Sequence, residues 1–158
     1  MVLRKDGRRI SLVREQELTT QEKENLSTYV KKLPVPRKLE YAARGNKEVR
    51  GILAKDPNKI VARAVITNPH VSEDEVYEFS RSTNVNEEVL RYIAENAGML
   101  KKHRVAVALC NNPRSPVGAA MRLLPRLDIR ELKLLAKNRE IPSTIRMQAR
   151  RIVTVKVK

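Results

Sequence analysis

The sequence predicts an all-α protein, an α-solenoid in which short helix pairs stack in series. One helix-ending motif recurs along the chain: an apolar pair, a spacer, and an Asn or Asp that is often followed by Pro. Its copies lie at residues 53–57, 65–69, 93–98, 109–113 and 135–138. Asn and Asp tolerate the left-handed or turn conformation that ends a helix, and Pro cannot continue one. Recurrence of one stop signal therefore indicates stacked helical units.

Helix-start signals recur between these stops. A Ser, Thr or Asp followed three residues later by Glu predicts a capping box, and Asn or Ser-Pro predicts a simpler start. The predicted caps are Thr19 or Thr20, Asn46, Ser72, Asn86, Ser115 with Pro116, and Asp128. The predicted helices are 20–32, 36–44, 47–55, 57–67, 73–82, 87–96, 101–111, 116–125, 129–138 and 142–153. Successive pairs begin about 26–28 residues apart, which is within the solenoid range.

Apolar residues within these helices have helical spacing, as at Val89, Leu90 and Ile93. Helices of about ten residues cannot bury such a stripe alone, so stacked neighbours must bury it jointly. We therefore expect a helical-repeat domain over residues 19–153, with clear repeats over 46–153.

The two ends of the chain lack this periodicity. Residues 1–18 contain Asp6-Gly7 between two short runs, which predicts a hairpin, with a basic disordered arm as the alternative. Residues 154–158 alternate Val with Thr or Lys and predict a short strand or an extended basic tail. The tail could pair with residues 10–13 or with a second copy of the chain, so a homodimer stays open.

The helix ends over residues 46–153 resemble those of the leucine-rich repeat variant and HEAT-like α-helical repeats. The motifs that carry the resemblance are Asp56-Pro57, Asn68-Pro69 and Asn112-Pro113. Asn96, followed by Ala-Gly, and Asn138, followed by Arg, depart from the pattern. The resemblance implies a right-handed superhelix but no single function, since such repeats serve many partners. Some leucine-rich variant proteins carry an iron–sulfur cluster, which a chain with one cysteine cannot hold.

Size and composition fit a single cytoplasmic domain. The chain has 158 residues, of which 41% are hydrophobic, enough for a core. No apolar run approaches the roughly 18 residues of a membrane span, and the first residues lack the apolar stretch of a signal peptide. The single cysteine, Cys110, excludes an internal disulfide and fits a reducing cytosol.

The net charge of +15 is unevenly distributed. Residues 1–70 carry 16 basic and 8 acidic residues, residues 71–100 carry 2 and 7, and residues 101–158 carry 15 and 3. Such asymmetry is typical of a polyanion-binding surface. A charged, solvated surface without a partner is the alternative.

Two groups of basic side chains are the candidate nucleic-acid-binding residues. The second helix of each pair carries an Arg that stacking would align along one face, and further Arg residues extend this row. This group comprises Arg63, Arg91, Arg122, Arg126, Arg146, Arg150 and Arg151. The second group, on the first helices of the last two pairs, comprises Lys101, Lys102, Arg104, Arg130, Lys133 and Lys137. Such cations suit phosphate oxygens, and a structural role in tying helix ends together is the alternative for each.

No pattern predicts catalysis, a metal or a cofactor. The two histidines, His70 and His103, do not form a ligand cluster, and the five glycines are scattered rather than gathered in a phosphate loop. Cys110 has the surroundings of a small core residue. The carboxylates over residues 73–78 suit helix capping and a solvated surface. We therefore expect a non-enzymatic protein.

The leading hypothesis is binding of nucleic acid through its phosphate backbone. With four Tyr, one Phe and no Trp, the chain has little with which to stack single-stranded bases, so duplex DNA is favoured and structured RNA stays open. A nucleoid-associated location would follow. The alternative is a protein-interaction adaptor whose groove binds an acidic peptide or partner domain. An anionic membrane surface is disfavoured, because stacking uses the apolar helix faces.

Overall fold

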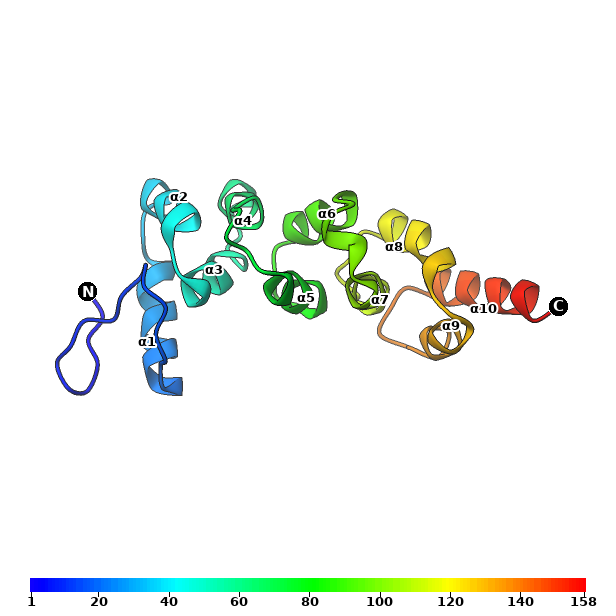
Figure 1. Cartoon of the computed structure of the whole chain (residues 1–158), viewed down its shortest axis with the longest axis horizontal. Helices are drawn as coiled ribbons and strands as arrows, with labels where there is room; N and C mark the ends of the chain where they lie inside the picture. The colour runs from blue at the N-terminus through cyan, green and yellow to red at the C-terminus, as the bar shows by residue number, and fades with distance from the viewer. The chain divides into compact units, whose positions relative to one another are not determined.

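The computed structural model describes all 158 residues and is all-helical (Figure 1). Ten α-helices and two 3₁₀ helices, labelled η, follow one another without a β-strand. The prediction of an all-α protein is therefore confirmed. Contacts divide the chain into two compact units, Met1–Val71 and Ser72–Lys158.

The first unit contains four helices that share one core. They are α1 (Thr20–Lys31), α2 (Val35–Arg44), α3 (Lys47–Leu53) and α4 (Lys59–Ile66). Helix α1 packs on α3, and α2 packs on both α3 and α4. Leu26, Ala42, Leu53, Val61 and Val65 are at most 1% exposed, so each of the four helices contributes buried apolar residues to this core.

The second unit contains six α-helices and the two 3₁₀ turns. They are α5 (Glu73–Arg81), α6 (Glu87–Glu95), η1 (Met99–Lys101), α7 (His103–Asn111), α8 (Val117–Leu123), η2 (Leu124–Arg126), α9 (Ile129–Leu135) and α10 (Ser143–Val157). Helices α5, α7 and α9 pack in one series, and α6, α8 and α10 pack in another (Figure 1). Helices α9 and α10 also pack on each other. This last contact positions the basic end of the chain.

Capping boxes form at Thr19, Ser72 and Asp128, as the sequence predicts. In each box the side chain accepts a hydrogen bond from the N–H three residues on, and a Glu at that position accepts one from the cap N–H. Two orphan donors of the helix start are satisfied in this way.

Three predicted helix starts are wrong. The helix expected from Lys101 begins at His103, because residues 99–101 form the 3₁₀ turn η1. The helix expected from Pro57 begins at Lys59, because the Asn58 side chain accepts hydrogen bonds from the first N–H groups of α4. Ser115 does not cap α8: its hydroxyl is buried without a hydrogen-bond partner, and Pro116 precedes the helix. Pro116 takes the cap position itself and has no side-chain acceptor, so α8 begins one residue later than the Ser-Pro pattern predicts.

The Asn112 amide joins the end of α7 to the end of α5 in the second unit. Asn112 Nδ2 donates to the backbone oxygens of Ser80 and Ser82, both at 2.8 Å. These carbonyls lie at the end of α5, where a helix has no acceptor partners of its own. Asn112 Oδ1 accepts from the Arg114 N–H at 2.9 Å, so both the nitrogen and the oxygen of the side-chain amide form hydrogen bonds.

The first unit repeats this arrangement. Asn68 Nδ2 donates to the backbone oxygens of Ala42 and Ala43 in the last turn of α2, at 2.9 and 3.1 Å. Asn46 Nδ2 donates to two carbonyls of the segment that precedes α1, at 3.0 and 2.9 Å. No residue other than Gly7 has a positive φ, so of the two conformations expected at the Asn and Asp helix ends the left-handed one does not occur. Asn is needed at these positions for its amide hydrogen bonds.

The predicted β segments at the two ends are not confirmed. At the N-terminus a single antiparallel bridge joins Leu3 and Arg9 around Gly7, whose φ is +79°. The extended tail predicted for residues 154–158 is wrong, because α10 runs to Val157. Lys156 Nζ donates to the backbone oxygen of Leu127 at 3.0 Å, and such tertiary contacts override the strand preference of alternating Val residues.

Replacing Asn112 by Asp keeps the acceptor for the Arg114 N–H but sets a carboxylate oxygen against two backbone carbonyls. We expect the free energy of unfolding, measured in urea, to fall by about 1–3 kcal/mol. Asn84→Asp, the same change at an exposed loop position, is the control and should stay within about 0.5 kcal/mol. Equal midpoints for the two variants would contradict a joining role for Asn112.

Position 45 requires glycine because there is no room for a Cβ atom. A Cβ there would collide with the Tyr41 backbone oxygen and the Val49 side chain, whereas a Cβ at Gly51 meets nothing within 4 Å. We expect Gly45→Ala to lower the thermal unfolding midpoint. Gly51→Ala, within α3, should raise stability by about 0.5–1 kcal/mol. A harmless Gly45→Ala would show that the α2–α3 corner can relax.

Candidate nucleic-acid interface

The end of the chain is rich in cations that have no acidic partner. Residues 132–158 contain eight basic residues and one acidic residue, Glu140. Seven of the predicted binding residues form no side-chain hydrogen bond or ion pair within the protein: Lys101, Arg122, Arg130, Lys133, Lys137, Arg146 and Arg151. Only Arg146 among them is half-buried, and the others are exposed.

Most of these cations lie on α8, on α9 with the turn after it, and on α10. We call the following set the C-terminal cationic surface: Arg122, Arg130, Lys133, Lys137, Arg146, Arg150 and Arg151. Helix α10 packs on both α8 and α9, so the elements that carry the set are neighbours. Their unbalanced charge gives this surface a positive potential that water and salt only partly screen.

The predicted row of mid-helix Arg residues divides between the two units. Arg63 lies on α4 in the first unit, whereas Arg91, Arg122 and Arg146 lie on α6, α8 and α10 in the second. Arg91 is already paired with Glu87 at 2.9 Å, one helical turn earlier. Exposed pairs of this kind are weak, at about 0.3–0.5 kcal/mol, so Arg91 remains available to a stronger anion.

The basic run that starts α7 is largely neutralised by its neighbours. Lys102 Nζ lies 3.5 Å from a Glu73 carboxylate oxygen, and Arg104 Nη2 lies 2.6 Å from Asp74 Oδ1. The acidic first turn of α5 therefore does more than cap its own helix. Of the predicted residues here, Lys101 alone keeps an unpaired charge.

Two predicted binding residues hold helix-end carbonyls. Arg126 Nη2 donates to the Leu100 oxygen at 2.7 Å, and Arg150 Nη2 donates to the Ala136 oxygen at 3.3 Å. These contacts tie the end of η1 and the end of α9 to later helices, which is the structural role weighed for such residues. A guanidinium has five N–H donors, so one contact leaves the others for a ligand.

A hollow of about 480 Å³ lies between α9 and α10. Lys133, Lys137 and Arg150 line it together with Ala136, Val153 and Thr154. No carboxylate is among the lining residues. The hollow therefore combines three positive groups with a partly apolar floor.

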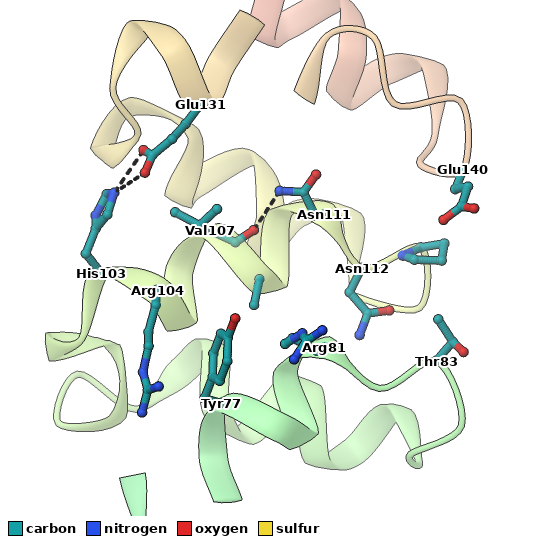
Figure 2. Close-up of a pocket in the computed structure, with 12 residues that line it drawn as sticks. Tyr77, Arg81, Thr83, His103, Arg104, Val107, Asn111, Asn112, Glu131 and Glu140 are labelled. Atoms are coloured by element: carbon teal, nitrogen blue, oxygen red, sulfur yellow. Dashed lines mark hydrogen bonds and ion pairs between the residues drawn. The ribbon is translucent and has the colours of Figure 1, made fainter. Parts of the chain in front are cut away.

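A second groove, of about 470 Å³, runs over α5, α7 and α9 (Figure 2). Tyr77 lies in it between Arg104 and Arg81, whose guanidinium carbons are 4.4 and 5.3 Å from the ring centroid. Contacts of this geometry are favourable cation–π pairs. Because the guanidinium groups cover the ring, it offers little surface on which a nucleobase could stack.

The remaining charges of this groove are mostly paired. His103 Nε2 lies 2.8 Å from Glu131 Oε2, as the dashed lines in Figure 2 show, and Arg81 lies 3.6 Å from a Glu78 oxygen. Glu140, at the far end, has no ion-pair partner. With one unpaired carboxylate and no unpaired Arg or Lys, this groove does not attract an acidic ligand.

The sequence analysis did not identify two contacts of this unit, the cation–π contact of Arg81 with Tyr77 and the hydrogen bonds of Lys156. The four-residue spacing of Tyr77 and Arg81 predicts contact on one helix face. Lys156 carried no signal, because its segment was expected to be extended. The donation of Lys156 Nζ to the Pro125 and Leu127 carbonyls holds the end of α10 on the unit.

No group of three or more His, Cys, Asp or Glu side chains converges as a metal site. None of the helices has the length and apolar content to cross a membrane. Comparison of the chain with protein-family models, curated proteins and solved structures finds no match. Its function is therefore inferred from the geometry of its own residues.

Cys110 is buried among apolar residues, and burial raises the pKa of its thiol from 9.0 to about 12, an effect that Arg126 partly opposes. Only the thiolate attacks alkylating reagents. At pH 8 we therefore expect iodoacetamide to label the native protein about 1000-fold more slowly than the urea-unfolded protein. Equally fast labelling would show that the α7–α8 core opens readily.

Proposed function

We propose that the chain is a non-enzymatic protein that binds nucleic acid through phosphate-backbone contacts from the C-terminal cationic surface. The observation that carries the proposal is the number of unpaired cations on α8, α9 and α10, where Glu140 is the only acidic residue after Glu131. Phosphate groups are the acceptors that Arg and Lys side chains bind without a fixed sequence preference.

Duplex DNA fits this surface better than a single strand. All four Tyr side chains are half-buried and Phe79 is 6% exposed, so no ring stands free for a base to stack on. Backbone contact requires only charges at suitable spacing, which structured RNA also satisfies. A nucleoid-associated, cytoplasmic location belongs to the same proposal.

We also propose how the helices are arranged beyond the all-α fold. A right-handed α-solenoid of the leucine-rich repeat variant or HEAT-like kind is supported by the recurring Asn contacts and by the two series of packed helices in the second unit. Such an architecture displays side chains at a regular spacing, which suits a polymer of regularly spaced phosphates.

An acidic protein partner is the second candidate, and the same cations would bind it. The partly apolar floor of the α9–α10 hollow favours it, because acidic peptides bring apolar side chains as well as carboxylates. The groove over α5, α7 and α9 does not suit such a peptide, since its unpaired charge is that of Glu140.

Charge reversal tests the proposal. The double variant Arg122→Glu with Arg151→Glu changes two exposed side chains that have no partner in the protein, so the fold should be retained. We expect at least about tenfold weaker binding to every duplex sequence in 0.1 M salt, because two phosphate contacts are lost. Fluorescence anisotropy measures the change.

The matched control reverses two exposed, unpaired lysines of the first unit, Lys55→Glu with Lys59→Glu. It alters net charge by the same amount. We expect affinity for duplex DNA to fall by less than about threefold, because only a long-range attraction that salt screens is lost. If both double variants weakened binding equally, total charge rather than the C-terminal cationic surface would be responsible.

A further inference from the structure

We propose that the hollow between α9 and α10 is a binding site for a single phosphate ester. The inference rests on the proposed function, because it assigns one phosphate of the bound nucleic acid to this hollow. The groups that would hold it are the side-chain nitrogens of Lys133, Lys137 and Arg150, which line one cavity without a carboxylate.

The three cations are drawn from different elements. Lys133 belongs to α9, Lys137 to the turn that follows, and Arg150 to α10. The C-terminal end of a helix stabilises cations, which accounts for a basic residue at this position. It does not account for a third cation brought from another helix to the same hollow, where the three charges repel one another until an anion is bound.

Arg150 is held in position by the protein. Its Nη2 donates to the Ala136 oxygen at 3.3 Å, and its own backbone oxygen accepts from the Thr154 hydroxyl at 3.0 Å. The first contact orients the guanidinium toward the end of α9 and leaves further N–H donors for phosphate oxygens. Because this donor is already ordered, a ligand pays less conformational entropy on binding.

The apolar part of the lining favours a phosphate ester over inorganic phosphate as the ligand. Ala136 is 6% exposed and Val153 is half-buried, so part of the lining is apolar. A sugar carbon next to a phosphate can cover this part, whereas water must otherwise hydrate it. Phosphodiesters of a nucleic acid and free phosphate esters share this chemistry, and the experiment separates them.

The test uses the double variant Lys133→Gln with Lys137→Gln, with Lys55→Gln and Lys59→Gln as the control pair. Both variants remove two exposed, unpaired charges. Duplex DNA binding is measured over a salt series. If the two lysines share one phosphate and Arg150 does not hold it without them, the log–log slope should fall by about 0.9 and affinity in 0.1 M salt by about eightfold. The control should leave the slope unchanged.

A slope that falls by about 1.8 would assign the lysines to separate phosphates and overturn the shared site. An unchanged slope, with wild-type duplex binding intact, would also overturn it while leaving the proposed function in place.

Titration of the intact protein with glycerol 3-phosphate, followed by NMR, provides a readout that needs no nucleic acid. Shifts of the Val153 and Thr154 amides that disappear in the Lys133→Gln, Lys137→Gln variant support the site. If they occur while the wild-type protein binds no duplex, the proposed function fails and the ligand is a free phosphate ester. If neither duplex nor glycerol 3-phosphate perturbs these amides, the hollow is not a phosphate site.

Discussion

The hydrogen bonds of the buried Asn amides hold the helices of this protein in register. The Asn68 and Asn112 amides supply N–H donors to carbonyls at the end of an earlier helix, where no intrahelical donor remains for those carbonyls. In the low-dielectric interior such bonds are strong, and leaving the carbonyls unpaired is costly. Short helices of seven to nine residues, too short to be stable alone, can be stacked on this basis. Where Asp56 stands in place of Asn, its carboxylate accepts a hydrogen bond from Lys38 Nζ at 2.6 Å.

This framework sorts the basic residues into three kinds. Some close helix ends, as Arg126 does on the Leu100 oxygen. Others pair with the acidic first turn of α5, as Arg104 does with Asp74. A third kind, which includes the exposed Arg122 of α8, Lys133 of α9 and Arg151 of α10, has no partner in the protein, and the proposed polyanion binding rests on it. Net charge alone does not separate these kinds, because it counts an arginine bound to a helix-end carbonyl and a solvated lysine equally.

Local signals in the sequence were sufficient for most of the fold. The capping boxes at Thr19, Ser72 and Asp128 predict their helix starts, because those contacts involve residues three apart. The donors of Asn112 could not be predicted, since its partners lie about 30 residues away. The helical conformation of residues 154–157 could not be predicted for the same reason, because Lys156 binds the distant carbonyls of Pro125 and Leu127. Of the candidate site, the sequence identified the cations of the hollow, but only packing of α9 against α10 brings Arg150 to Lys133 and Lys137.

The central claim is that unpaired cations on one surface bind phosphates. It is tested most directly by fluorescence anisotropy of the intact protein with labelled duplex DNA, structured RNA and an acidic peptide, each over a salt series. The account predicts duplex binding whose log–log salt slope is several, at about 0.9 for each phosphate contacted. It also predicts weaker binding of the peptide. Absence of binding to either nucleic acid at low salt, with tight binding of the peptide, would contradict it and identify the surface as a protein-docking site.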